Sequence, residues 1–296
     1  MTHLKGRAAR WMGFLACAAS LAAPGLASAA TAADQLYERT LMTAADGRCR
    51  LFAPAIGSAL DAARAQARGA TLRSGAPQAQ VEALEQRARA KAAGTACDSK
   101  DLTIAATRVR TAFDAYKTMQ RITYPGDVSA WQAERNSSAT IPIWRLSQPS
   151  SFGADRLIFG LAGRAGSVTA AATFSNGDRP YAARVVLRDT GRTQAPYIDT
   201  RGGRALSSKV APRSASLVFN AETREESPLT LLPVGAKTGL SFRFPPGVAD
   251  AISRLDPREA VTIEFSFARG GIGDADLVRK AYVEVGDFAA GRAFLR

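Results

Sequence analysis

The fold is decided by residues 49–97, whose sequence, CRLFAPAIGSALDAARAQARGATLRSGAPQAQVEALEQRARAKAAGTAC, begins and ends with cysteine. Across residues 37–70, small and apolar residues recur at steps of three and four, which is one face of a helix. Residues 73–77, RSGAP, end this pattern because glycine and proline do not continue a helix. A second stripe runs over residues 81–92. The pattern predicts two antiparallel helices joined by a tight turn.

The two cysteines fit this hairpin. In an antiparallel hairpin, the position numbers of any two facing residues add up to the same sum, and half of that sum marks the turn. For Cys49 and Cys97 half of the sum is 73, which lies inside the predicted turn. A single cysteine is more often a small buried apolar residue, but a pair in an oxidising compartment favours a bridge. We therefore predict a Cys49–Cys97 disulfide across the hairpin. Gly47 and Pro54 predict a kink or break in its first helix.

A third helix is predicted after the second cysteine. Ser99 can cap it, and apolar residues recur at steps of three and four from Leu102 to Tyr116. We expect residues 30–122 to form a helical domain in which this helix closes a three-helix bundle. The simplest interpretation of this domain is a packed bundle without a site, because its apolar faces cover one another.

Residues 1–29 have the layout of a bacterial Sec-type signal peptide. Basic residues occur among the first ten positions, no charged residue occurs over residues 11–33, and residues 27–29, ASA, offer a cleavage site. An uncleaved membrane anchor is the alternative, because the uncharged stretch is long enough to span a bilayer. Its high alanine content and the Pro24–Gly25 pair disfavour that alternative. We predict a periplasmic or secreted protein without a stable transmembrane anchor after cleavage.

Cleavage would leave few residues for metal or nucleophilic chemistry. It removes His3, the only histidine, and Cys17, so that Cys49 and Cys97 are the remaining cysteines. Ser-His-Asp and Cys-His catalysis are then excluded, as are zinc, iron and copper sites built on imidazole or thiolate ligands. We expect no cofactor and no metal of these kinds. Carboxylate chemistry, Ser/Lys chemistry and calcium bound by oxygen atoms stay open.

The chain is basic, with a formal net charge of +13 that includes three basic residues of the predicted signal peptide. The excess is spread over the helical and later regions rather than gathered in one tail or stripe. A nucleic-acid partner is not expected, because proteins that bind nucleic acids usually concentrate their positive charge on one face. The predicted secretory signal of this chain also argues against such a partner. An anionic envelope polymer or an envelope protein is the partner that the charge and the compartment favour.

The second half of the chain changes from helical to strand periodicity. Residues 123–150 are rich in Ser, Pro and Asn and are predicted to be a linker, with a candidate strand at residues 141–144. Residues 151–296 are predicted to form a β-rich domain. Its strands are expected at residues 157–161, 168–174, 182–187, 240–244, 261–267 and 281–285, with a short helix at residues 248–255 and a hairpin turn at residues 175–178.

The predicted fold class is therefore α+β in two parts. A disulfide-stapled helical hairpin or three-helix bundle precedes an antiparallel β-sandwich-like domain with one short helix. The order strand, short helix, strand, strand, GDFAA over roughly the last sixty residues resembles the ending of small secreted bacterial sandwich proteins of the invasion-associated locus B type. This chain lacks cysteines there, and no residue or activity is carried over from that resemblance.

One long, turn-rich segment, residues 188–213, is a candidate anion-binding loop. Several glycines give its backbone the freedom to wrap an anion. Its basic side chains are Arg188, Arg192, Arg201, Arg204, Lys209 and Arg213. A solvated surface loop without a ligand is the alternative, and it is the more common case.

Carboxylates offer the other candidate chemistry. Asp274 and Asp276 form a D-x-D pair in a glycine-rich turn, and Glu264 lies on the polar face of a predicted strand. No second carboxylate can be paired with Glu264 from the sequence. We expect an envelope protein that works as a non-enzymatic binding or structural module. A carboxylate-based hydrolase of cell-envelope glycan is the alternative, and it requires two carboxylates about 5 to 9.5 Å apart in one cleft.

Overall fold

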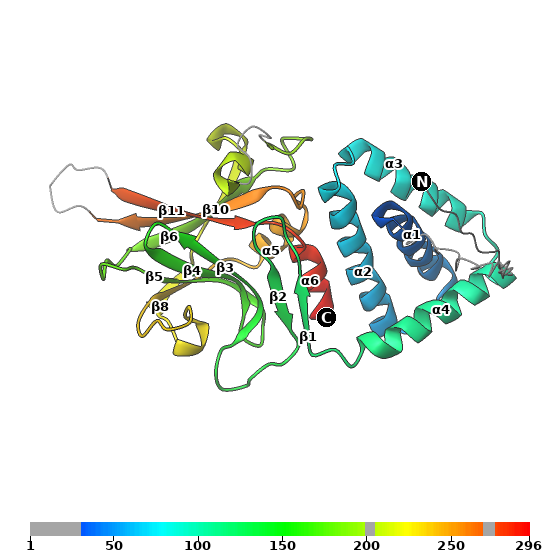
Figure 1. Ribbon diagram of the computed structural model, residues 1–296, viewed down its shortest axis with the longest axis horizontal. Coiled ribbons are helices and arrows are strands. Elements are labelled where there is room, and N and C mark those ends of the chain that lie inside the picture. Colours follow the sequence, from blue (N-terminus) through cyan, green and yellow to red (C-terminus); the bar gives the residue numbers. More distant parts are fainter. Residues whose placement is uncertain (1–30, 199–204, 269–275) are drawn as a thin grey trace, which may run out of the picture.

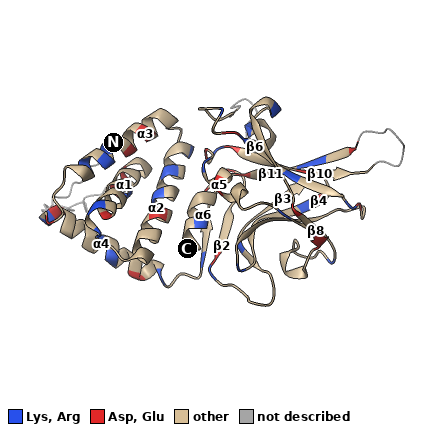
Figure 2. Ribbon diagram, turned by 180° about the vertical axis from the view of Figure 1, so that it is seen from behind, with Lys and Arg blue, Asp and Glu red and all other residues tan. Residues whose placement is uncertain are grey.

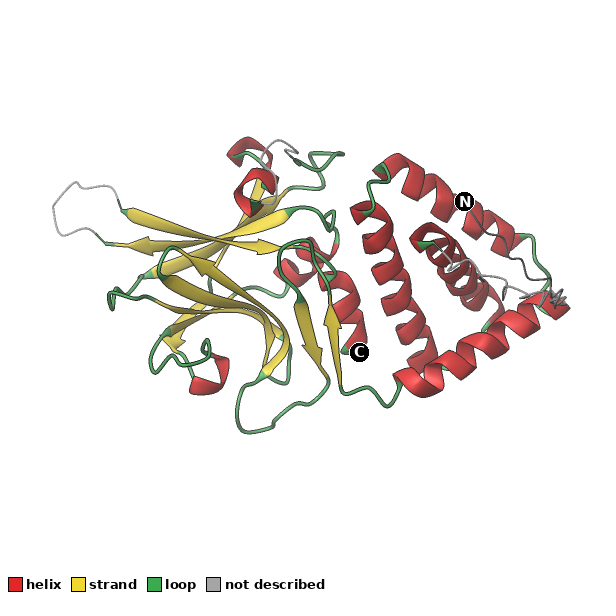
Figure 3. Ribbon diagram, in the orientation of Figure 1, coloured by secondary structure: helices red, strands yellow, loops and turns green. Residues whose placement is uncertain are grey.

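The computed structural model describes residues 31–198, 205–268 and 276–296 of the chain (Figure 1). Helices form the first part of the chain and antiparallel strands form the second, as Figure 3 shows by colour. The predicted fold class is confirmed. The predicted signal peptide, residues 1–29, lies outside the described residues. Among the helices that the structure describes, none is both long and apolar enough to cross a membrane.

The helical part, residues 31–116, contains four helices in the described chain. They are α1 (Ala32–Cys49), α2 (Pro54–Arg73), α3 (Gln78–Ala93) and α4 (Lys100–Tyr116). Thr31 and Asp34 form a capping box at the start of α1. At the start of α4, the Ser99 hydroxyl accepts a hydrogen bond from the N–H of Leu102, so the predicted cap is confirmed.

The first predicted helix is in fact two helices, because the chain reverses at residues 50–53. Arg50 adopts a left-handed φ of 53°, and the Asp46 carboxylate accepts a hydrogen bond of 2.9 Å from the N–H of Phe52. Pro54 then begins α2, where a proline loses no hydrogen bond. As a result, α1 packs between α2 and α3, antiparallel to α2 and parallel to α3 (Figure 1).

The Cys49–Cys97 disulfide is confirmed, with Cα atoms 5.6 Å apart. It links the end of α1 to the loop after α3. The two cysteines do not face each other across the α2–α3 hairpin, because the reversal at residues 50–53 lies between Cys49 and α2. The Cys49–Cys97 pairing was therefore predicted correctly, but the predicted alignment of the two helices that led to it was wrong.

The β part, residues 121–296, consists of two antiparallel sheets in the described chain. One sheet has the strand order β1-β2-β3-β4-β5-β9-β8 and the other has the order β11-β10-β6-β7. The elements are β1 (Arg121–Tyr124), β2 (Trp131–Glu134), β3 (Trp144–Phe152), β4 (Asp155–Ala162), β5 (Ser167–Thr173), β6 (Ala182–Arg188), β7 (Ser216–Asn220), β8 (Thr223–Glu226), β9 (Leu240–Arg243), α5 (Gly247–Ser253), β10 (Ala260–Phe267), β11 (Leu277–Glu284) and α6 (Phe288–Phe294), with short 3-10 helices at η2 (Leu206–Lys209), η3 (Arg213–Ala215) and η4 (Leu229–Leu231).

The main core lies between the two sheets. Phe159 and Phe242 from the longer sheet and Phe265 from the shorter one are fully buried in it. The short helices α5 and α6 close one end, and they add Ile252 and Phe288 to the same core. Because α6 also packs against α2, the closed end of the sandwich is the end that meets the helical part (Figure 1).

Two predictions for the β part differ from the structure. Residues 123–150, predicted to be a linker, contain β2 and most of β3, which belong to the longer sheet. Residues 175–178, predicted to be a hairpin turn, carry the chain from β5 in one sheet to β6 in the other, so the hairpin prediction is wrong. The Asp155 carboxylate accepts hydrogen bonds from Ser175 and holds this crossing in place.

The disulfide is expected to stabilise the helical part more than the β part. Replacing both Cys49 and Cys97 with Ala opens a loop whose ends are 48 residues apart, and chain entropy sets the cost at about 4 kcal/mol. Far-UV circular dichroism follows mainly the helices, whereas Trp131 and Trp144 report on the β part by fluorescence. The melting temperature should fall further by dichroism than by fluorescence, and an equal fall in both would contradict this expectation.

Candidate functional site

The helical and β parts meet where α2 lies against α6. Gly69 of α2 makes this approach possible, because a Cβ atom at that position would overlap Oδ1 of Asp287. Asp287 directly precedes α6 and its side chain is 1% exposed. A glycine inside a helix lowers the stability of that helix. At this position, however, it lets the backbone of α2 come into contact with the Asp287 carboxylate.

Arg73, at the end of α2, forms a two-point ion pair with Asp287. Its NH1 and NH2 atoms donate to the two carboxylate oxygens at 2.7 and 2.9 Å. Burial raises the pKa of the Asp287 carboxyl, and the hydrogen bond and charge of Arg73 oppose that change. Desolvation lowers the pKa of Arg73, but Asp287 outweighs it, so the pKa of the guanidinium is raised. The pair joins the two parts by a charge-assisted contact away from water.

A second buried carboxylate fixes the chain on the β side of the junction. The Glu284 carboxylate accepts hydrogen bonds from the backbone N–H groups of Asp127, Val128 and Ser129 at 2.6, 2.8 and 2.9 Å. The indole N–H of Trp131 donates to the backbone oxygen of Glu284 at 3.1 Å. These bonds hold residues 127–131 against the end of β11, next to Asp287.

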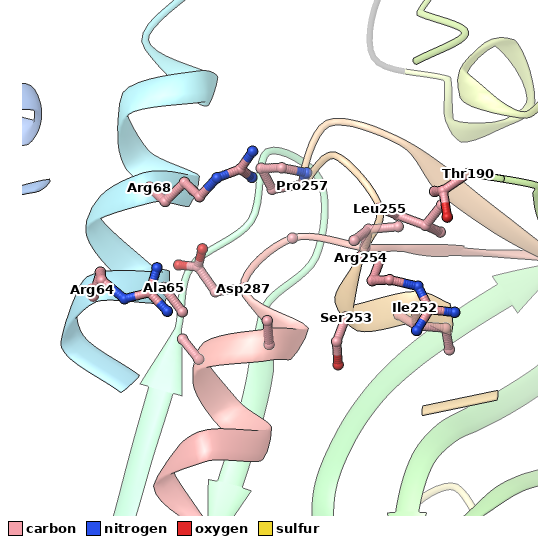
Figure 4. Close-up of a pocket in the computed structure, with 15 residues that line it drawn as sticks. Arg64, Ala65, Arg68, Thr190, Ile252, Ser253, Arg254, Leu255, Pro257 and Asp287 are labelled. Atoms are coloured by element: carbon pink, nitrogen blue, oxygen red, sulfur yellow. The ribbon is translucent and has the colours of Figure 1, made fainter. Parts of the chain in front are cut away.

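A groove of about 460 Å³ opens at this junction. In Figure 4, α2 forms one wall with Arg64 and Arg68, and the end of α5 forms the opposite wall, where the Arg254 side chain extends away from α2. Asp287 lies between the walls. Arginines are thus placed on both sides of one concave surface, and we call it the junction groove. It is the candidate functional site.

The junction groove keeps a net positive charge after its ion pairs are counted. Arg64 and Arg68 both approach the carboxylate of Glu85 on α3, at 3.7 and 3.8 Å, and Arg64 also lies 3.6 Å from the carboxylate of Asp61. Glu85 Oε1 is buried and has no hydrogen-bond partner among the described residues, so these contacts are electrostatic rather than hydrogen-bonded. Arg254 is exposed and Asp287 is already paired with Arg73. Arg64 and Arg68 are therefore partly balanced by carboxylates, and Arg254 is the exposed guanidinium of the three.

The predicted anion-binding loop is arranged differently. Arg188 is buried in an ion pair with Glu259, Lys209 lies 3.8 Å from Asp127, and Arg213 lies 3.3 Å from Glu264. Arg192 is exposed, while Arg201 and Arg204 lie outside the described residues. The described basic side chains of this segment therefore do not converge on one patch, because three of them contact three different carboxylates.

The junction groove was not predicted from the sequence, although part of its signal was present. Arg64 and Arg68 are four residues apart within a predicted helix, which places them on the same face. Arg254 comes from a segment almost two hundred residues later, and no periodic pattern connects it with α2. Figure 2 shows basic residues along α2 and on α6, on the two sides of the junction.

Among the described residues, the carboxylate suggested by the sequence, Glu264, is surrounded by cations rather than by a second carboxylate. Glu264 contacts Arg184 at 2.5 Å and Lys280 and Arg213 at 3.3 Å. Burial raises the pKa of Glu264, but these cations outweigh burial, so its pKa is lowered. Asp276 is hydrogen-bonded to Tyr181, and Asp274 lies outside the described residues.

A further groove between α1 and α4 carries Glu38 and Asp101 at its rim. Both are solvent-exposed, whereas a glycosidase holds its general acid in an apolar, water-excluded environment. The junction groove contains the single carboxylate of Asp287 among its lining residues. Within the described ranges, no group of three or more His, Cys, Asp or Glu residues is arranged to hold a metal ion.

Comparisons with known proteins do not place this chain in a family. The chain matches no protein-family model, and neither a similar curated protein nor a similar solved structure was found. The candidate site therefore rests on the geometry and charge of the junction groove.

Glu264 should stabilise the fold only above acidic pH. Its pKa lies below the ordinary value of 4.5 in the folded protein, so its stabilising effect is present above that pH and is lost as the pH falls through the lower, folded-state pKa. Glu264→Gln should lower the free energy of unfolding at pH 7 by about 2 kcal/mol. The difference from the wild type should shrink towards pH 3 in urea titrations. The exposed control Glu225→Gln should change little, and a constant difference for Glu264→Gln would refute the assignment.

Proposed function

We propose that the mature protein is a non-enzymatic binding module of the bacterial cell envelope, and that its junction groove binds an anionic envelope polymer. The observation that carries the proposal is the placement of Arg64, Arg68 and Arg254 on one concave surface. The carboxylate in that surface, Asp287, is already neutralised by Arg73. A polymer that carries phosphate or carboxylate groups has the chemistry that such a surface recognises.

The proposed location outside the cytoplasm rests on two features. The sequence of residues 1–29 has the layout of a cleavable secretory signal. The Cys49–Cys97 disulfide is the kind of crosslink that persists in the periplasm or the extracellular space, where thiols are not kept reduced. Both features support a periplasmic or secreted protein. Envelope polymers are abundant in those compartments and many of them are anionic.

Binding without chemistry is favoured over glycan hydrolysis by the state of the carboxylates. A glycosidase needs one carboxylic acid and one carboxylate facing the same cleft, about 5 to 9.5 Å apart. The junction groove offers Asp287 alone among its lining residues, and Asp287 is fully engaged by Arg73. Glu264, the carboxylate that the sequence suggested, is buried beneath three cations on one face of the shorter sheet.

The strength of such binding is expected to come from several contacts together. A single exposed guanidinium contributes about 0.2 to 1 kcal/mol to an ion pair in water. Three guanidinium groups on one polymer segment would then contribute roughly 0.6 to 3 kcal/mol, or about threefold to a hundredfold in affinity. Because the groove is open to solvent, salt should screen these contacts over a distance of about 10 Å at 0.1 M.

Removing the three guanidinium charges should weaken binding to envelope polymers. The variant Arg64→Gln/Arg68→Gln/Arg254→Gln should bind lipopolysaccharide or teichoic acid about tenfold more weakly than the wild type at low salt. The wild-type affinity should itself fall as the salt concentration rises. Isothermal titration calorimetry with each purified polymer measures both effects.

A matched control separates the junction groove from overall charge. Arg87→Gln/Arg108→Gln/Lys237→Gln removes the same charge from three exposed positions outside the junction groove. This control should retain wild-type affinity. Equal weakening of both variants, or an absence of binding by the wild type to either polymer, would contradict the proposal.

A further inference from the structure

A second basic groove lies at the opposite end of α5. Its volume is about 510 Å³, and we call it the distal groove. Its lining includes the basic residues Arg145, Arg243, Arg292 and Arg296. Leu161, Phe244 and Leu295 contribute apolar surface, and Glu222 is the single acidic side chain among the lining residues. The charge of the distal groove therefore has the same sign as that of the junction groove.

The arginines of the distal groove differ in how firmly they are held. NH2 of Arg145 donates to the backbone oxygen of Leu295 at 3.1 Å, which fixes its side chain along the groove. Arg292 is paired with Asp250 at 2.6 Å. Arg243, at the end of β9, and Arg296 are exposed. Arg243 and Arg296 are thus the two positions where an anion can approach without displacing a described ion pair.

Helix α5 connects the two grooves. Pro246 and Ala249, at its beginning, line the distal groove, and Ile252, Ser253 and Arg254, at its end, line the junction groove. A helix of seven residues is only about 10 Å long. The two grooves therefore border the same short element.

Arg292 bridges the gap between the grooves along α5. From α6, its NH1 atom donates to Asp250 and to the hydroxyl of Ser253 at 3.3 Å. Arg292 lines the distal groove and Ser253 lines the junction groove. Arg292 therefore lies where the two grooves approach each other, although its charge there is balanced by Asp250. The unpaired basic side chains lie on either side of this point, at the two grooves.

We infer that the ligand is a linear polyanion, with an anionic group in each repeat unit, that runs from the junction groove past Arg292 into the distal groove. This inference rests on the proposed function and adds the form of the ligand to it. A small anion fills one groove and gains nothing from the other. A polymer held in one groove reaches the second at a high effective concentration, which raises its affinity without any stronger single contact.

Inorganic polyphosphate is a suitable probe, because its length can be changed while its chemistry stays the same. Tripolyphosphate and size-fractionated long-chain polyphosphate are titrated into the full protein by calorimetry, with affinity expressed per phosphate unit. The wild type should bind the long chain at least about tenfold more tightly. Arg243→Gln/Arg296→Gln should reduce the affinity for the long chain to that for tripolyphosphate, and far-UV circular dichroism checks that this variant is folded.

The outcomes separate this inference from the proposed function. If Arg243→Gln/Arg296→Gln binds the long chain as the wild type does, while Arg64→Gln/Arg68→Gln/Arg254→Gln does not, the junction groove acts alone and the inference fails. If the wild type binds neither length, both proposals fail. If Arg87→Gln/Arg108→Gln/Lys237→Gln weakens binding as much as the other variants, the effect is one of net charge, and both proposals are again overturned.

Discussion

The ion pair between Arg73 and Asp287 is the contact on which the arrangement of the two parts depends. The Asp287 side chain is buried, at 1% exposure, and the Arg73 side chain is mostly covered, at 12%. Removing one partner would leave the other charge buried and uncompensated, which is costly. Gly69 allows the contact, because any larger residue would overlap Asp287. The two walls of the junction groove come from different parts of the chain, and this pair holds them together at the end of α2.

Contacts within the β part hold α6, and with it Asp287, in position. Glu284 holds residues 127–129 through three backbone hydrogen bonds, and Phe288 anchors α6 in the sandwich core. Arg135 adds a further link, because its guanidinium lies over both the ring of Tyr116, at the end of α4, and the ring of Phe294 of α6, and these two rings also contact each other. The helical part is thus joined to α6 at the ends of both α2 and α4. The position of α6 matters for the proposed polyanion path, since α6 also carries Arg292.

The sequence predicted those features that local periodicity encodes. The helical faces, the Ser99 cap and the alternating strand at residues 261–267 are each determined by nearby residues, and they were found. The reversal at residues 50–53 was predicted only as a kink or break, because its left-handed Arg50 has no glycine to mark it. Strands β1 and β2 have four residues each, too short for a periodic signal. Contacts such as Arg188 with Glu259, or Arg64 opposite Arg254, depend on tertiary structure, so neither the pairing of the loop cations nor the junction groove could be predicted.

A double-mutant cycle on Arg73→Met and Asp287→Asn tests the central claim most directly. The free energy of unfolding of the helical part is measured by urea titration with far-UV circular dichroism. Each single substitution should cost about 3 kcal/mol or more, because it leaves a buried group without its partner. The double variant should be less destabilised than the sum of the two, with a coupling energy of about 2 to 3 kcal/mol. Additive effects, with no coupling between the two positions, would contradict the claim that this pair holds the two parts together.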